Sequence, residues 1–478
     1  MAETGKSFIK KFVGFSMVTW ISFAIGFLTA PIATRLFAPD VVGKINIFNT
    51  YSNLFGIFIL IGLDQAFARF YLERPNKKSV GYLFTFCFGI TYSILAVTII
   101  ASIPFDSFIS LHLFEENDIF LLYLFFISVF CTSTLRYLNL SYRMEKNIKM
   151  YTIQGVLMTL VSKCFYLAVG FWDPSYKPAL FVLTITHLIL AIIFLVIQRK
   201  RFVIIKKVDK LFAKEMFKYA LPLTPVTLLM WANTSIPQVV MQKTMDYTSI
   251  GLFTSAAALA GLISLIQAGF NTFWLPYTYE NYKTQTGQFE KVHRYLMCML
   301  AIFAILLILS QDVVFLLLGE KYRSAKLFFP YLILGPVCYI ISETTGMGID
   351  ISKKTYYNIL VFSSSVLVNI LLCLLLQIPL GLTGIAIATA VASIVSMVIK
   401  TVIGQKYYRA IDHYRYMIAT IIFVIIGALI TQLMYDVIAI KIVMLLILFL
   451  FALLFFKTEI VELKQYAVSI INDYKKKK

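Results

Sequence analysis

Apolar residues occur in runs of roughly 20 along nearly the whole chain, and short polar segments separate these runs. A run of that length spans the hydrocarbon core of a bilayer as an α-helix, in which the backbone groups bond within the segment. The pattern predicts an all-α integral membrane protein with about 14 transmembrane helices. The predicted spans are 12–34, 43–66, 80–102, 118–136, 151–171, 178–197, 217–241, 248–271, 293–310, 326–345, 356–376, 380–400, 415–433 and 438–456.

The composition supports a membrane protein and argues against an enzyme. Hydrophobic residues make up 60% of the chain and charged residues 14%, whereas a soluble domain carries about 25% charged residues. The six cysteines lie in apolar runs without CxxC spacing, and the four histidines are scattered, so neither a disulfide nor a metal site is predicted. The sequence contains no glycine-rich phosphate loop, nucleophile elbow or HExxH helix. We therefore expect no catalytic residues and no cofactor, and a proton or sodium gradient could supply the driving force.

The basic residues predict how the chain is oriented. The formal charge is +19, but lysine and arginine lie in short loops between apolar runs, which favours topology signals beside anionic membrane lipids over a nucleic-acid partner. If both termini are cytoplasmic, most of these basic residues fall on the cytoplasmic side of the cell membrane. The loop after the third predicted helix contains no base and four acids, namely Asp106, Glu115, Glu116 and Asp118.

A long basic segment divides the first twelve helices into two groups of six. The two halves also match weakly at a constant offset, at which Gly43 aligns with Gly251 and Tyr71 with Tyr279. Two such halves would enclose a transport path between them. The predicted domains are an N-terminal lobe 1–198, a cytoplasmic linker 199–216, a C-terminal lobe 217–410, two extra helices 411–456 and a basic cytoplasmic tail 457–478.

Lys163 is the base predicted to lie deepest in the membrane, near the middle of the fifth helix. A charge at the bilayer centre costs about 2.5–3.5 kcal/mol on insertion scales, so the side chain needs a partner, water or a ligand. One interpretation is a cation that meets a negatively charged substrate in a polar cavity. The other is a lysine that reaches the interface or pairs structurally with a neighbouring helix.

A second group of charges lies at the inner ends of the second and fourth helices. Gln65 and Arg69 share one helix face, and Asp64 could pair with Arg69 or with a base on another helix. Arg136 is the deepest base of the fourth helix. These residues could form the inner lip of a cavity and contact substrate, or they could be ordinary charges at the headgroups.

Three further residues are candidate substrate contacts. His187 lies in the sixth helix, and Trp231 and Asn233 lie in the seventh. Trp231 could stack on sugar rings, and Asn233 begins a polar stripe. Packing and helix–helix hydrogen bonds explain these positions as well as a cavity does.

Five stretches carry a resemblance to a known family. In order along the chain they are Pro31–Gly43, Ile61–Tyr71, Leu318–Ala325, Gly346–Thr355, and Asn369 with Ile378–Thr389. Their order and spacing resemble the Wzx-like polysaccharide flippases of the multidrug/oligosaccharidyl-lipid/polysaccharide exporter superfamily. Many relatives carry an Asp-Arg pair in the seventh helix after the tryptophan. Here Trp231–Val240 contains no such pair, which puts an ion-coupling role of this helix in doubt.

The resemblance implies alternating access between two lobes, twelve core helices and two more at the end. The substrate would be an undecaprenyl-pyrophosphate-linked oligosaccharide repeat unit of an O-antigen or capsule, flipped from the cytoplasmic to the outer leaflet. Polysaccharide polymerase and chain-length proteins would be partners. Because a pyrophosphate needs cations in low dielectric, Lys163, Arg69 and Arg136 are the preferred contacts.

Three other functions remain open. A cation-coupled multidrug exporter of the same superfamily would need carboxylates in its cavity, and the helices offer few. A membrane-embedded polysaccharide polymerase or glycosyltransferase usually carries a large outer loop, which this chain does not show. A flippase for a peptidoglycan precursor or another isoprenoid-linked glycan is barely separable by sequence.

Overall fold

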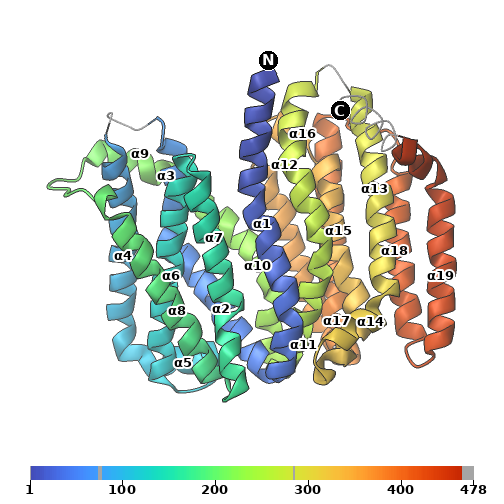
Figure 1. Ribbon diagram of the computed structural model, residues 1–478, viewed down its shortest axis with the longest axis horizontal. Helices are drawn as coiled ribbons and strands as arrows, with labels where there is room; N and C mark the ends of the chain where they lie inside the picture. Colours follow the sequence, from blue (N-terminus) through green and yellow to red (C-terminus); the bar gives the residue numbers. More distant parts are fainter. Residues whose placement is uncertain (1, 74–77, 284–285, 466–478) are drawn as a thin grey trace. The chain divides into compact units, whose positions relative to one another are not determined.

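The computed structural model describes residues 2–73, 78–283 and 286–465, and these form helices joined by short connections (Figure 1). They divide into two compact units, Met1–Gly251 (unit 1) and Leu252–Lys478 (unit 2). The helices of unit 1 are α1 Ala2–Leu36, α2 Pro39–Leu60, α3 Leu63–Phe70, α4 Val80–Ser102, α5 Asp106–Phe114, α6 Ile119–Met144, α7 Ile148–Lys163, α8 Tyr176–Ile197, α9 Lys210–Ala220, α10 Leu223–Thr244 and the start of α11 Tyr247–Ala260. Those of unit 2 are α12 Ser264–Asn281, α13 Thr286–Leu309, α14 Gln311–Leu317, α15 Phe329–Thr345, α16 Gly348–Ile351, α17 Tyr357–Tyr407, α18 Arg415–Leu433 and α19 Ile438–Phe455.

The structure confirms the all-α membrane fold but not the number of spans. Within the described residues, ten helices are long and apolar enough to cross a membrane, or up to twelve if each of two bent pairs is one span. The bent pairs are α2 with α3, at 56°, and the 3₁₀ helix Glu320–Leu327 with α15, at 64°. Every predicted span coincides with helix, but the count of fourteen is not confirmed.

Two local features explain the difference in number. The predicted spans 356–376 and 380–400 are counted together as α17, but the backbone breaks between them at Gly381, with φ of 54° and ψ of −132°. The two halves fold back on each other, because the hydroxyl of Ser365 donates to the carbonyl of Ala392 over 3.1 Å. Helix α10 is not among the candidate spans, because Asn233, Gln238 and Gln242 lower its hydropathy. Its polar side chains bond to α2 instead: Thr50 donates to Gln238 over 2.8 Å.

Helix α10 packs on α2 within unit 1. The lobe boundaries predicted from the sequence stay a prediction, because a division into two compact units does not test whether the two lobes are repeats of one another. Residues 466–478 of the predicted tail lie outside the described residues, whereas 457–465 are helical.

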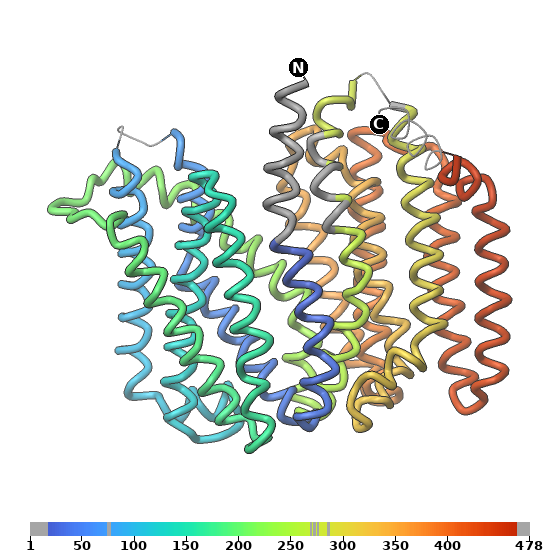
Figure 2. The backbone as a smooth tube through the Cα atoms, in the orientation of Figure 1, coloured from blue at the N-terminus to red at the C-terminus, as the bar shows by residue number. Residues whose placement is uncertain are grey.

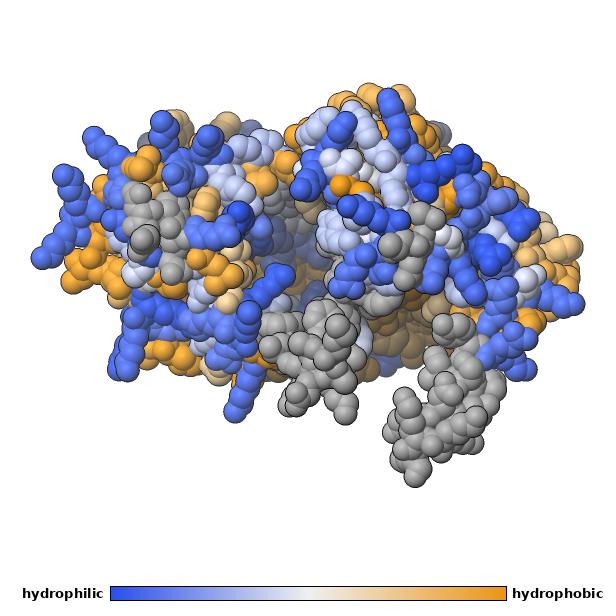
Figure 3. All heavy atoms as spheres, turned by 90° about the horizontal axis from the view of Figure 1, so that it is seen from above, coloured by the Kyte–Doolittle hydropathy of each residue, from blue (hydrophilic) through white to orange (hydrophobic). Residues whose placement is uncertain are grey.

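Unit 1 is a bundle in which α6 packs against α2, α7 and α8. Helices α3 and α9 lie at one end, called here the upper end, and α5 lies at the opposite, lower end (Figure 1). Hydrophilic side chains gather on the upper end when it is seen from above (Figure 3). Below that surface, Phe67, Phe84 and Tyr137 pack edge to face, with ring centroids 5.8 Å and 6.4 Å from Phe67. These aromatic contacts fix the upper halves of α3, α4 and α6 relative to one another.

Helices α2 and α11 cross at two glycines that the sequence repeat had aligned. A Cβ on Gly43 would lie 1.9 Å from the carbonyl oxygen of Tyr247, and a Cβ on Gly251 would lie 1.9 Å from that of Pro39. Only residues without a side chain permit this approach. The contact is reciprocal: the glycine of each helix lies against the carbonyl of the first residue of the other helix, Tyr247 of α11 or Pro39 of α2.

Unit 2 is built around α15 and α17, which form its most extensive helix pair. Helix α13 packs on α18 and α19, which run antiparallel at the edge of the unit (red in Figure 2). Helix α19 carries Lys441, whose side chain is only 1% exposed. Its Nζ lies 2.5 Å from Oδ2 of Asp312, and Lys326 contacts Oδ1 of the same carboxylate over 3.1 Å.

Candidate functional site

Unit 1 contains a polar cavity of about 660 Å³, called here the lobe cavity. Helices α2, α3, α6, α7, α8 and α10 all contribute side chains to it. The lining residues are Ser52, Asn53, Gly56, Ile57, Leu60, Gly62, Asp64, Gln65, Ala68, Thr132, Ser133, Arg136, Asn139, Leu140, Arg143, Met144, Tyr151, Met158, Ser162, His187 and Thr227. Hydroxyl, amide and guanidinium groups alternate with apolar side chains, as a site for a large polar ligand requires.

The break between α2 and α3 places Asp64 in this cavity. Ile61 and Gly62 both adopt left-handed conformations, with φ of 40° and 76°. A Cβ on Gly62 would also lie 2.3 Å from the carbonyl oxygen of Ala220, so glycine is required there for two reasons. The chain restarts as α3 at Leu63, and Asp64 falls in its first turn, where the helix dipole favours a negative charge.

Asp64 forms an ion pair with Arg136 of α6. The Arg136 Nη2 and Nε atoms lie 2.6 Å and 2.8 Å from Oδ2 of Asp64. The carboxylate is buried, with 5% of its side chain exposed, whereas 51% of the Arg136 side chain is exposed and free to meet a ligand. Gln65 donates a longer hydrogen bond, 3.3 Å, to the same oxygen. The sequence left the partner of Asp64 open, and the structure pairs it with Arg136.

His187 lines the same cavity and is buried. Its Nδ1 lies 2.7 Å from the carbonyl oxygen of Leu183, so this nitrogen carries a proton and donates. Its Nε2 lies 3.0 Å from the hydroxyl of Ser162, which also donates to the carbonyl of Met158 over 2.7 Å. The single hydroxyl proton can serve one of these two acceptors at a time, so the Ser162 rotamer and the protonation of His187 are linked.

Four other predicted residues lie outside the lining of the lobe cavity. Lys163 is the last residue of α7, where the α-helix gives way to the 3₁₀ helix Phe165–Phe171, and its side chain is exposed. Arg69 is paired with Glu73 on the exposed face of α3, at 3.0 Å. Trp231 donates its indole N–H to the carbonyl of Thr50 over 3.2 Å, and Asn233 lies half-buried on the same helix. The substrate roles of these four residues stay predictions.

The sequence had not singled out several cavity residues. Arg143 is not among the predicted site residues, but it lines the cavity two helical turns from Arg136 on α6. Asn139 lies one turn from each of them and donates to the carbonyl of Tyr151 over 3.2 Å. The spacing 136, 139, 143 places all three on one helix face, and this was the signal that could have found them.

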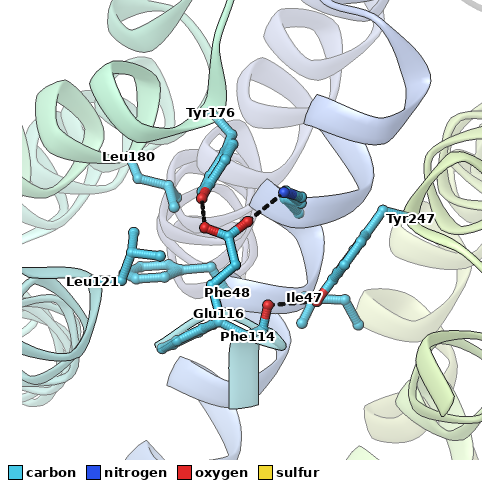
Figure 4. A pocket seen from close by; sticks show the side chains of 9 residues that line it. Ile47, Phe48, Phe114, Glu116, Leu121, Tyr176, Leu180 and Tyr247 are labelled. Atoms are coloured by element: carbon cyan, nitrogen blue, oxygen red, sulfur yellow. Dashed lines mark hydrogen bonds and ion pairs between the residues drawn. The ribbon is translucent and has the colours of Figure 1, made fainter. Parts of the chain in front are cut away.

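A charged cluster surrounds Glu116, which follows α5 at the lower end of unit 1, and Figure 4 shows Tyr176 pointing to its carboxylate. Glu116 accepts hydrogen bonds from Tyr176 and from Lys44, the latter over 2.6 Å. The Lys44 ammonium also lies 4.2 Å from the centroid of the Tyr176 ring. Lys177 binds Asp118, which caps α6 by accepting from the backbone of Phe120. These contacts join α2, α6 and α8 around the acidic loop noted in the sequence.

The cluster changes the acidity of both carboxyl groups. Burial alone would raise the pKa of Glu116, but the hydrogen bonds from Lys44 and Tyr176 outweigh it and hold that pKa below the usual 4.5. The hydrogen bond from Lys177 chiefly lowers the pKa of Asp118 below 3.8. A carboxyl whose pKa falls on folding stabilises the protein above its ordinary pKa, and the effect is lost as pH falls through the lowered value.

Replacement Glu116→Gln is therefore expected to lower the midpoint of thermal unfolding in detergent at pH 7. The difference from the parent protein should shrink as pH falls from the ordinary 4.5 through the lowered pKa of Glu116, because this carboxyl then becomes protonated in the folded protein as well. The matched control is Glu73→Gln, since the exposed pair of Glu73 with Arg69 contributes little. A Glu116→Gln midpoint equal to that of the parent at pH 7 would contradict the stabilising role of the cluster.

The family model described as "polysaccharide biosynthesis protein" matches residues 8–281, which is more than half of the chain. The chain belongs to this family. The resemblance that the five sequence stretches indicated is thus confirmed. A protein described as an uncharacterized membrane protein of Haemophilus influenzae is 23% identical over 351 residues, which cover 65% of this chain and 78% of that protein.

Solved structures share the fold of this family member. The structure described as "Lipid II flippase MurJ, inward closed conformation" superposes with a TM-score of 0.70 at 17% identity, covering 93% of this chain and 99% of that one. An inward-facing multidrug resistance MATE family transporter of the MOP superfamily gives 0.54 at 13% identity, covering 80% of this chain and 94% of that one. The chain thus shares its fold with these multi-pass membrane proteins.

Proposed function

We propose that this chain flips undecaprenyl-pyrophosphate-linked oligosaccharide repeat units from the cytoplasmic to the outer leaflet of the cell membrane. The lobe cavity is the observation that carries the proposal. It combines a half-exposed guanidinium, Arg136, with a second one, Arg143, and with amide and hydroxyl groups. Guanidinium groups bind phosphate oxygens in pairs, and the amides and hydroxyls suit the hydroxyl-rich glycan.

The membrane geometry of the proposal follows the basic residues. Both termini are placed in the cytoplasm, as the positive-inside rule favours. The glycan would travel through the protein by alternating access while the prenyl chain stays in lipid. A proton or sodium gradient as the driving force, and a polysaccharide polymerase and chain-length proteins as partners, stay predictions.

Deletion of the gene tests the proposal. We expect surface polysaccharide to be lost and lipid-linked repeat units to accumulate in the inner leaflet, since their synthesis does not need the transporter. The measurement is surface glycan by immunoblot, together with extracted lipid-linked units and their accessibility to a glycan-modifying enzyme added outside spheroplasts. Plasmid-borne wild type should restore the surface glycan.

Two other results would replace the proposal. Repeat units that reach the outer leaflet but stay unpolymerised would indicate a polymerase. Normal surface glycan with new drug sensitivity would indicate a multidrug exporter. The structure gives the exporter little support, because Asp64 is the one carboxylate among the described residues that line the lobe cavity, and it is already paired.

A further inference from the structure

Unit 2 contains a second polar cavity, at the end where α13 and α18 begin. Its volume is about 350 Å³, and its lining includes Glu290, Lys291, Arg294, His413, Arg415 and Tyr416. The candidate spans Gly287–Leu309 and Arg415–Leu433 both start at this level. Hydrophilic side chains gather over this end of unit 2 (Figure 3). The cavity therefore lies where two spans leave the hydrocarbon core, at the depth of the lipid headgroups.

The cavity holds more positive than negative charge. The guanidinium groups of Arg294 and Arg415 lie 5.8 Å and 4.6 Å from the centroid of the buried Tyr416 ring, which holds both beside the cavity. Arg294 is balanced by two acids on the helical segment 457–465, Glu459 at 3.5 Å and Glu462 at 3.7 Å.

Two other cations of the cavity have no acidic partner among the described residues. Lys291 and Arg415 form no salt bridge within the described residues, and both side chains are exposed. Glu290, the one carboxylate among the described lining residues, is bonded to His413 over 2.9 Å. Among the described lining residues, three cations therefore face one carboxylate, and such a lining favours an anion.

We propose that this cavity binds the phosphodiester headgroup of an anionic phospholipid. An apolar groove of about 450 Å³ follows along the same helix and includes Cys298, Met299 and Ile302 of α13 together with Ile460 and Leu463. Cys298 lies one helical turn beyond Arg294, so the groove starts directly below the charged cavity. A charged cavity above an apolar groove matches a headgroup with its acyl chain, whereas a free phosphate would use only the upper part.

The proposal is tested with the double variant Lys291→Gln/Arg415→Gln. Neither residue pairs with an acid among the residues that the structure describes, so the change leaves no described buried carboxylate unpaired, as replacing Arg294 would do to Glu459. The full-length chain is purified in neutral detergent and titrated with phosphatidylglycerol or phosphatidylcholine, and native mass spectrometry counts the bound lipid. We expect wild type to retain phosphatidylglycerol in preference to phosphatidylcholine. The variant should bind phosphatidylglycerol about thirtyfold more weakly, since each surface cation contributes roughly a factor of five to affinity.

The matched control is Lys206→Gln/Lys207→Gln, which removes two exposed charges from unit 1. It should bind phosphatidylglycerol as wild type does. Equal phosphatidylglycerol binding by the two double variants, at equal elution volume in size-exclusion chromatography, would overturn the proposal. Inorganic phosphate is the second probe. If millimolar phosphate displaces the bound lipid as readily as excess phosphatidylglycerol does, the cavity recognises free phosphate and the lipid proposal is wrong.

Discussion

The double variant Asp64→Asn/Arg136→Gln is expected to lose transport, whereas Asp64→Asn alone should keep most of it. In the single variant the guanidinium of Arg136 stays in the lobe cavity and is relieved of its carboxylate partner. In the double variant the cavity loses this cation while the two amides can still bond to each other. A hydrogen bond to a charged group is worth about 1.5–3 kcal/mol, so transport should fall roughly ten- to a hundredfold.

The pairing of these two variants separates binding from folding. Arg136→Gln alone would leave the buried Asp64 carboxylate without its cation, which costs about 3–5 kcal/mol and would reduce the amount of folded protein. Transport is measured as surface glycan restored in the deletion strain, normalised to protein in the membrane. Equal restoration by both variants would show that the pair is only structural. Lys163→Ala, measured beside them, tests the exposed lysine at the end of α7.

Replacement Asp312→Ala is expected to destabilise the chain by about 3–5 kcal/mol, the cost of leaving a buried charge unpaired. Lys441 is almost completely buried, and Asp312 is its ion-pair partner within the described residues. Burial alone would raise the pKa of Asp312, but hydrogen bonds from Lys441 and Lys326 hold it below the usual 3.8. The carboxylate is therefore charged at neutral pH and joins α14 to α19.

Replacement of the partner, Lys441, provides the control. Lys441→Met should cost much less, because Asp312 keeps its contact with Lys326 and methionine fills a similar volume. Unfolding can be followed with a thiol-reactive dye, since Cys298 and Cys338 are buried and become accessible only on opening. Equal midpoints for Asp312→Ala and Lys441→Met would show that the buried ammonium is not what makes Asp312 necessary.

The helices and their class were predictable because hydrophobic transfer acts on each segment separately. An apolar run long enough to cross a bilayer forms a helix whatever its neighbours are, and every predicted span is helical in the structure. The breaks were less predictable. The left-handed backbone at Ile61 and Gly62 depends on the close approach of Gly62 to Ala220, which is distant in the sequence.

The same distinction holds for the candidate site: the residues were predictable from the sequence, and their partners were not. Asp64, Gln65, Arg136 and His187 were predictable because a polar group in an apolar run is costly and needs a partner. The identity of each partner was not predictable: Asp64 could have paired with Arg69, but the turn into α3 directs it to Arg136. Arg69 faces the exposed surface and binds Glu73.

The sequence by itself determined that this protein is an all-helical membrane protein, that its motifs resemble polysaccharide flippases, and which polar residues lie within apolar runs. These properties depend on composition and local order, which each segment carries alone. The tertiary structure decided which of those residues meet: the lobe cavity, the Gly43–Gly251 crossing and the ion pair of Asp312 with Lys441. Such contacts join segments far apart in the chain, and their geometry depends on how the helices pack, which no single segment specifies.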